Sequence, residues 1–339
     1  MNSYLHTFTL IIAAVALSVT PLSANEKVDR IVWPSAPDPA RIQYEGSFTK
    51  AADLKIEKGF WAKAWSFIVG DEDPVINKPF GLHTDDKRIY VTDKEAGTLF
   101  IFGTKENEFK AVRGGDDDPF RSLIDVTTDE KGTIYLSDSV SGVIHVLSKN
   151  GKHQRTIGKG KLHRPTGIAY STSKKLLYVC DTVENTIKLF DTKGKVVNTI
   201  GKGGSHVGQF NKPTFIALDK DDTLYVSDSM NQRIQIFDAK GKFLRTFGEI
   251  GNQIGEFANP RGIAVDNSGN IYVTDTIFNA IQIFSNNGEL LMLLGNYGNA
   301  PGQFSLPEDI EITKDGKIYV SDLLNGRIQT FQLLPEQKK

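Results

Sequence analysis

Five side chains capable of metal binding or proton transfer interrupt a repeated pattern of small residues. At two positions spaced two apart, several repeats carry Gly or Ala, as in Gly262 and Ala264 or Gly167 and Ala169. The corresponding positions of other repeats hold His83, Asp125, Thr127, Asp309 and Glu311. Carboxylate oxygens are ligands that calcium prefers. His83, Asp125, Asp309 and Glu311 are therefore candidate metal ligands, with ordinary drift from the repeat as the alternative explanation.

An aspartate ends each copy of a second pattern, which reads IYVTD at residues 89–93. Near-copies end at Asp138, Asp181, Asp228, Asp275 and Asp322. Each carboxylate belongs to its own repeat, so the symmetry of a ring would keep the six apart rather than gather them on one ion. An Asp at the end of a strand commonly accepts backbone N–H bonds in the turn that follows. We therefore expect these aspartates to be structural.

The elements that position these residues follow from the repeat length. The aspartates are 43 to 47 residues apart, a spacing typical of solenoids, propellers and arrays. The repeat over 259–294 has four short β-rich runs (262–266, 270–275, 280–284 and 289–294), separated by Asn, Ser and Gly, without helical periodicity. Four antiparallel strands repeated six times predict an all-β, six-bladed β-propeller. IYVTD is then the second strand of a blade, with its Tyr facing one neighbouring blade and its Ile and Val the other.

The last repeat lacks a fourth strand, because the chain ends at RIQTFQLLPEQKK. Residues 42–48, IQYEGSF, have the pattern of the missing strand. We therefore expect this N-terminal strand to complete the last blade and close the ring, removing exposed strand edges. The expected organisation is a signal peptide over 1–24, a leader with the closing strand and a short helical insertion over 25–73, six blades over 74–334 and a tail over 335–339.

The N-terminal residues indicate export. The apolar run 8–19 is short for a membrane span, which needs about 20 residues, and Leu22-Ser23-Ala24 is a plausible cleavage site before Asn25. We predict a periplasmic or extracellular protein without a transmembrane segment after cleavage, with an uncleaved anchor as the alternative. The formal net charge of −1 argues against a nucleic-acid partner. Cys180 is the single cysteine and is expected to be a buried small side chain.

The blades resemble the NHL-repeat family of β-propellers. The resemblance rests on the pattern PxGIAVDxxGNIYVTDxxNxRIQxF, which is clearest in residues 259–284 and 213–237 and extends over roughly residues 74–334. The middle histidine of the family pattern is replaced, for example by Gln232. The opening IVWPSAPDPARIQYEGSF also resembles leaders of exported bacterial six-bladed propellers of unassigned activity. The resemblance implies the same fold.

The resemblance also implies two chemistries. Lyases of this family hold zinc with histidines near the starts of the innermost strands. The residues after the strand-leading prolines are Phe80, Thr166, Thr214, Arg261 and Glu308, so the zinc site is not carried over. Related six-bladed lactonases bind calcium in the channel through carboxylates and amides, which keeps a calcium-dependent hydrolase or lyase open. RNA binding, known in intracellular relatives, is disfavoured by the export signal.

One insertion and two turns offer candidate docking residues. KGFWAKAWSFIVG at 58–70 places Trp61 and Trp65 four residues apart, on one face of a predicted helix. Packing of this helix on the propeller is the alternative to docking. The turns after the YVTD motifs and the connections between blades should share one face. The candidate binding residues on this face are Trp61, Trp65, Met230, Asn231, Arg233, Arg261, Phe278 and Glu308.

These observations favour a non-catalytic scaffold of the bacterial envelope that binds another envelope protein or a peptide. No cofactor is expected, with calcium in the channel as the alternative.

Overall fold

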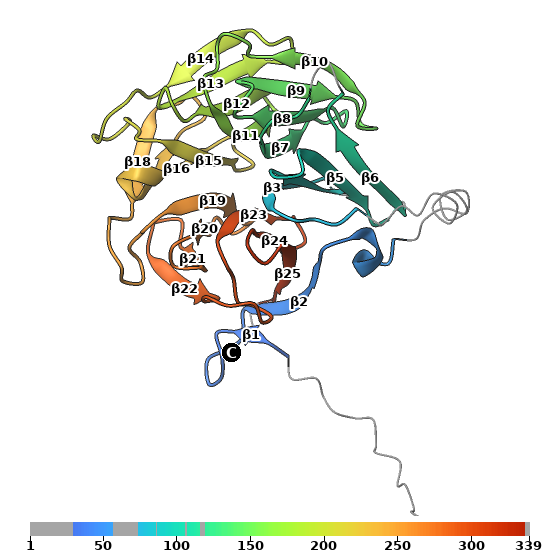
Figure 1. Cartoon of the computed structure of the whole chain (residues 1–339). Helices are drawn as coiled ribbons and strands as arrows, with labels where there is room; N and C mark the ends of the chain where they lie inside the picture. Colours follow the sequence, from blue (N-terminus) through green and yellow to red (C-terminus); the bar gives the residue numbers. More distant parts are fainter. Residues whose placement is uncertain (1–29, 57–73, 86, 106, 116–118, 336–339) are drawn as a thin grey trace, which may run out of the picture. The chain divides into compact units, whose positions relative to one another are not determined.

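Each repeat folds into four strands because its apolar runs alternate with turns rich in Gly, Asn and Asp. The computed structural model describes residues 30–56, 74–85, 87–105, 107–115 and 119–335. It arranges the strands as six antiparallel sheets around a central axis (Figure 1). The predicted six-bladed β-propeller is confirmed.

The first five blades share one order, in which the first strand lies innermost and the fourth outermost. Blade one contains β3 (Pro79–Thr84), β4 (Ile89–Asp93), β5 (Thr98–Gly103) and β6 (Glu108–Arg113). Blade two contains β7 (Leu123–Thr128), β8 (Ile134–Asp138), β9 (Val143–Leu147) and β10 (His153–Ile157). Blade three contains β11 (Pro165–Ser171), β12 (Leu176–Asp181), β13 (Thr186–Asp191) and β14 (Val196–Ile200). Blade four contains β15 (Pro213–Leu218), β16 (Leu224–Asp228), β17 (Arg233–Phe237) and β18 (Phe243–Phe247). Blade five contains β19 (Pro260–Val265), β20 (Ile271–Asp275), β21 (Ala280–Phe284) and β22 (Leu290–Leu294).

Blade six joins the two ends of the propeller. Its strands are β23 (Pro307–Ile312), β24 (Lys317–Asp322), β25 (Arg327–Leu333), β2 (Ile42–Phe48) and β1 (Val32–Trp33). β2 pairs with β25 from Ile42 opposite Leu333 to Phe48 opposite Ile328, so the predicted closing strand is confirmed. The segment around Trp33 forms the short strand β1 at the outer edge of this sheet, and the half-buried Trp33 ring packs 5.7 Å from the Phe331 ring.

Helices among the described residues are limited to the 3-10 turns η1 (Ala51–Leu54) and η2 (Ser229–Asn231). No helix in this part of the chain is long and apolar enough to cross a membrane. The predicted signal peptide and the predicted helix with Trp61 and Trp65 lie outside the described residues.

The IYVTD motif is repeated because its first four positions contact the neighbouring blades. In blade one, Tyr90 packs with the core of blade two, whereas Ile89 and Val91 pack with that of blade six, as predicted. The Thr92 hydroxyl accepts the Gly81 N–H at 2.8 Å and donates to the Ile124 carbonyl of blade two at 2.9 Å. The motif therefore supplies both apolar contacts and a hydrogen bond between blades.

The six aspartates are structural, as expected. Asp93 accepts backbone N–H bonds from Asn77 and Lys78 in the preceding connection, and from Glu95 and Ala96 in the following turn. Each carboxylate therefore ties the turn after the second strand to the start of its own blade.

The innermost strands lie close together around the axis, which explains their small residues. A Cβ on Gly167 would lie 2.6 Å from the Phe215 Cα of the next blade, and one on Gly262 would lie 2.5 Å from the Asp309 Cα. Only glycine allows these approaches. The larger residues at the equivalent position, Asp125, Phe215 and Asp309, belong to blades two, four and six, so glycines and larger side chains alternate around the ring.

The propeller has two different faces. One face carries the turns between second and third strands together with the connections between blades, and we call it the connection face. These two kinds of loop share a face because the second and fourth strands of a blade run in the same direction. The opposite face carries the turns between first and second strands and between third and fourth strands. The innermost strands begin at the connection face.

Candidate functional site

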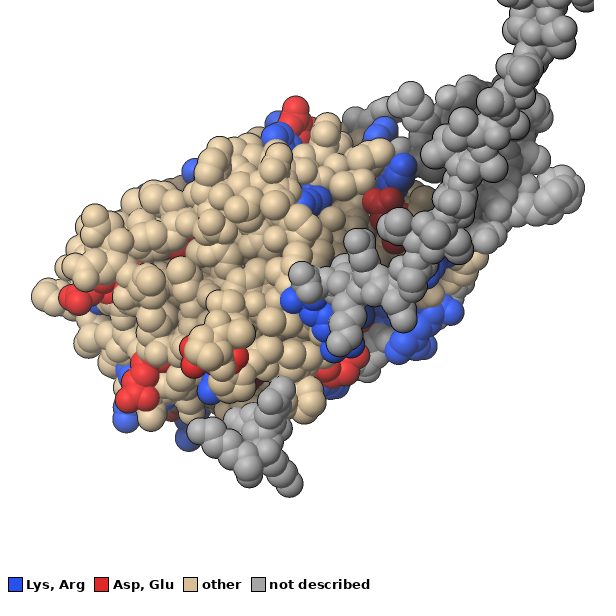
Figure 2. Space-filling view, turned by 90° about the horizontal axis from the view of Figure 1, so that it is seen from below, with Lys and Arg blue, Asp and Glu red and all other residues tan. Residues whose placement is uncertain are grey.

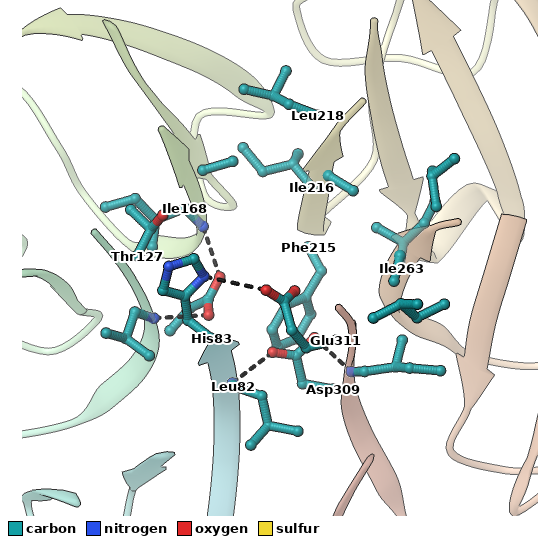
Figure 3. A pocket seen from close by; sticks show the side chains of 18 of the residues that line it. Leu82, His83, Thr127, Ile168, Phe215, Ile216, Leu218, Ile263, Asp309 and Glu311 are labelled. Atoms are coloured by element: carbon teal, nitrogen blue, oxygen red, sulfur yellow. Dashed lines mark hydrogen bonds and ion pairs between the residues drawn. The ribbon is translucent and has the colours of Figure 1, made fainter. Parts of the chain in front are cut away.

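The central channel contains a cavity of about 200 Å³ with two chemically different walls. His83, Asp125, Asp309 and Glu311, from blades one, two and six, line one side (Figure 3). Ile216, Leu218 and Ile263, from blades four and five, line the other. The structure therefore brings together the four candidate metal ligands, which we call the acidic sector.

Asp125 and Asp309 each join two blades through their carboxylates. The Asp125 Oδ1 accepts the Val126 N–H at 2.7 Å, and its Oδ2 accepts the Ile168 N–H of blade three at 2.8 Å. Asp309 repeats this arrangement with Ile310 at 2.9 Å and Leu82 of blade one at 2.8 Å. Both oxygens of each carboxylate therefore satisfy backbone donors in a buried setting.

His83 and Glu311 form a second polar pair beside these aspartates. The His83 Nδ1 lies 3.3 Å from the Glu311 Oε1, and its Nε2 lies 3.0 Å from the Thr128 hydroxyl. The same Glu311 oxygen accepts the Thr84 N–H at 3.2 Å. Every member of the acidic sector is therefore held by partners within the propeller.

The cavity shifts the protonation of its lining groups. Burial raises the pKa of Asp125 to about 7, although the N–H bonds from Ile168 and Val126 oppose the shift. Burial also raises the pKa of Asp309 well above its ordinary value, and repulsion from Asp125 raises it further. Burial lowers the pKa of His83, but the carboxylates of Glu311, Asp125 and Asp85 together outweigh this effect, so the net pKa is raised.

We predict that replacing Asp125 and Asp309 with Asn flattens the pH dependence of stability. Because these carboxyls have higher pKa values in the folded than in the unfolded chain, the folded protein holds more protons between the ordinary value of 3.8 and about 7. Stability then falls as pH rises through this window. Urea unfolding measured about one pH unit or more below 6.5, the ordinary pKa of His83, largely avoids the titration of that residue. Asp221→Asn, at an exposed position in the turn between β15 and β16, is the control that keeps the slope, and an unchanged slope in the double variant would contradict the prediction.

The acidic sector does not form a compact ligand set for a metal ion. Among the described residues, no three members of the sector bring ligand atoms within 4.8 Å of one another. The group that meets this distance is His163, Asp181 and Glu184 on the connection face. The Lys188 ammonium already lies 3.3 Å from the Asp181 Oδ2 and contacts Glu184, so this group has its own cation.

The channel is filled between this cavity and the connection face. Phe80 of blade one stacks on Phe215 of blade four at 6.1 Å, and both are buried together with Ile124. Blades one and four lie on opposite sides of the ring, so this contact crosses the axis. Arg261 and Glu308 lie at this channel mouth, with the Arg261 Nε 3.2 Å from the Glu308 Oε2.

The predicted docking residues have different surroundings. Met230 is exposed and Phe278 is half-buried. The Arg233 guanidinium binds Asp228 and the carbonyls of Ser205, His206 and Gln209. Asn231 donates to Asp228 and to the Gly204 carbonyl. Arg233 and Asn231 thus hold a connection between blades, and their role in binding stays a prediction, as does that of Trp61 and Trp65.

Sequence reasoning missed how many apolar side chains the connection face exposes. The second residue after the motif aspartate is apolar and exposed in five blades: Val140, Val183, Met230, Ile277 and Leu324. The connections between blades add Val75, Val207, Ile250, Ile254 and Tyr297. The remaining exposed large apolar residues of the described chain lie at the outer edge: Ile31, Val197, Leu244, Leu290 and Leu291. Aligning the six turns after YVTD would have revealed the pattern.

Comparisons with known proteins support the fold. A family model described as a 6-bladed beta-propeller matches residues 217–275. No curated protein matches the sequence. A Bacteroides thetaiotaomicron protein of unknown function has a similar structure, with 15% identity, a TM-score of 0.61 and coverage of 76% of this chain and 70% of that one.

Two enzymes share the architecture at similarly low identity. The virginiamycin B lyase of Staphylococcus aureus has 16% identity and a TM-score of 0.57, over 76% of this chain and 96% of the lyase. The hydrazine synthase of Kuenenia stuttgartiensis has 12% identity and a TM-score of 0.56, over 77% of this chain and 97% of that one. These likenesses concern the fold.

Proposed function

We propose that this protein is a non-catalytic scaffold of the bacterial envelope that binds another protein through its connection face. The observation that carries the proposal is the distribution of exposed apolar side chains. They gather on the connection face and on the outer edge, and in the described chain none lies in the turns of the opposite face. Apolar groups concentrated on one surface typically mark an interaction site.

The connection face also holds these side chains rigidly. Phe210, Phe257 and Phe304 anchor three of the connections in the core. In the first of them, the Gln235 side chain accepts the Gly208 N–H at 2.8 Å and donates to the Gln209 carbonyl at 2.6 Å. A surface that is already ordered loses little conformational entropy when a partner binds. This arrangement supports a binding role.

The envelope location rests on the sequence. The apolar run 8–19 and the site at Leu22-Ser23-Ala24 support export, and NHL-type repeats remain our prediction for the family of the blades. The channel carboxylates support the non-catalytic assignment, because both oxygens of Asp125 and Asp309 are committed to backbone donors.

We predict that Met230→Ser, Ile277→Ser and Leu324→Ser together abolish partner binding without unfolding the propeller. All three side chains are more than half exposed, and surface substitutions typically change stability by no more than about 0.5 kcal/mol. Photo-crosslinking in intact cells, with p-benzoyl-phenylalanine in place of Val140, measures binding. One discrete protein adduct should form, and the triple variant should lose it at an unchanged melting temperature.

Matched positions test whether the connection face is specific. Val197→Ser with Leu244→Ser, which alters exposed apolar residues of β14 and β18, should leave the adduct intact. A crosslinker in place of Leu291 probes the outer wall near β22, where Figure 2 shows few charged side chains. An adduct that forms from position 291 instead of 140, or that persists in the triple variant, would contradict the assignment.

A calcium-dependent hydrolase or lyase is the second candidate, because the four acidic-sector residues line one cavity. Calorimetric titration of chelator-treated protein with calcium chloride tests it. Binding of one ion that is lost in the Asp125→Asn and Asp309→Asn double variant would favour this candidate over the scaffold.

A further inference from the structure

Three cationic side chains surround the channel mouth on the connection face, each from a different blade. Lys94 follows β4 in blade one, Arg164 precedes β11 in blade three and Arg261 lies in β19 of blade five. The Lys94 ammonium lies 4.8 Å and the Arg261 guanidinium 6.0 Å from the centroid of the same Phe80 ring. Lys94 and Arg261 thus place positive charge above the Phe80–Phe215 contact, and the exposed Arg164 adds its charge near Lys94.

The propeller itself compensates these charges incompletely. Glu308 is the carboxylate beside them, and its Oε2 lies 3.2 Å from the Arg261 Nε. The geometry is not that of a hydrogen bond, so both buried atoms lack a hydrogen-bond partner in the described structure. Lys94 and Arg164 form no ion pair with any described carboxylate. Loss of hydration lowers the pKa of Lys94; Glu308 opposes the shift, while Arg261 and Arg164 add to it.

Apolar side chains from five of the six blades stand around this cationic mouth, and we call them the apolar ring. Val140, Val183, Met230, Ile277 and Leu324 stand in the turns after the second strands, one blade after another. A ligand that places an anionic group in the mouth must therefore also cover the apolar surface of the propeller around it. Guanidinium and ammonium groups bind carboxylates through charge-assisted hydrogen bonds, which strengthen when water is excluded.

We propose that the channel mouth binds an Asp or Glu side chain that is carried on an apolar loop of the partner protein. This inference rests on the proposed scaffold function. The convergence of three cations on the axis fits one inserted carboxylate, whereas a lipid surface would place many headgroups across the whole face. The partner carboxylate contacts Lys94 and Arg164 and takes the donors of Arg261 that Glu308 leaves unused. The apolar ring excludes water around this contact.

The partner segment crosslinked from position 140 provides the test. Mass spectrometry of the adduct should identify an Asp or Glu flanked by apolar residues. Lys94→Glu with Arg164→Glu should lower the affinity of the purified partner about tenfold or more, because a close charge pair becomes a like-charge contact. Changing that partner carboxylate to Lys should restore binding to the charge-reversed propeller. Lys131→Glu with Lys193→Glu, on the opposite face, is the control that leaves affinity unchanged.

The outcomes separate this inference from the proposed function. One outcome is a complex that the triple variant at Met230, Ile277 and Leu324 abolishes, but whose affinity is unchanged by the charge reversals at Lys94 and Arg164. That result overturns the carboxylate site and leaves the scaffold function standing. A crosslinked segment without an acidic residue does the same. An adduct with lipid or with a second copy of this chain, or no adduct from position 140, overturns both.

Discussion

A chain from which residues 31–48 are deleted is expected to lose cooperative folding. β2 forms the outer partner of β25, and its end residues Ile42 and Phe48 are each only 1% exposed. The Phe48 ring packs 5.3 Å from Phe102 of blade one, while Ile42 belongs to the core between blades five and six. The deletion would therefore open two apolar clusters and the edge of β25 together.

The size of the effect follows from the side chains involved. Replacing a buried Phe with Ala typically costs about 3–5 kcal/mol, and a whole domain is stable by only about 5–15 kcal/mol. Circular dichroism during heating should show no cooperative transition for the deletion. Phe48→Ala alone should melt cooperatively at a lower temperature. A chain that begins at Ala40 keeps β2 and lacks β1, and is expected to stay folded. A deletion variant that melted like the parent chain would show that the ring does not need this strand.

Much of the fold could be predicted from the sequence because the repeat is regular. The IYVTD motif performs the same contacts in each blade, so its six copies reveal the number of blades and the second strand of each. The closing strand was also predictable, because one unit lacked a strand that residues 42–48 could supply. The packing of Trp33 was missed, since no repeat contains an equivalent residue.

The site was harder to predict because its contacts join blades far apart in the sequence. Departure from the repeat singled out Asp125 and Asp309 as candidate ligands, but it did not indicate that each accepts an N–H from the next blade. Arg233 and Asn231 looked like exposed anchors, whereas their hydrogen bonds hold a connection that lies beside them only in the folded propeller. The cationic mouth likewise draws Lys94, Arg164 and Arg261 from three different blades.

Asp228→Ala is expected to be among the most destabilising single substitutions in the propeller. The Asp228 carboxylate is fully buried and accepts the Asn211 N–H at 2.7 Å. It also accepts the Arg233 Nε at 2.8 Å and the Gln235 Nε2 at 2.9 Å. Its removal leaves a largely buried guanidinium without its carboxylate. Breaking a buried ion pair from one side typically costs about 3–5 kcal/mol, because the remaining charge stays uncompensated.

A double-variant cycle separates the ion pair from the other contacts of this aspartate. Arg233→Met removes the cation, so Asp228→Ala should cost less in that background, with a coupling of about 0.5–3 kcal/mol in urea unfolding. Asp238→Ala is the matched control, because Asp238 accepts two turn N–H groups at 2.8 and 2.9 Å but lies at the solvent-exposed turn between β17 and β18. Its effect should be much smaller, since water can satisfy the released donors. Equal losses from Asp228→Ala and Asp238→Ala would mean that the turn geometry, rather than the buried charge network, makes the repeated aspartate necessary.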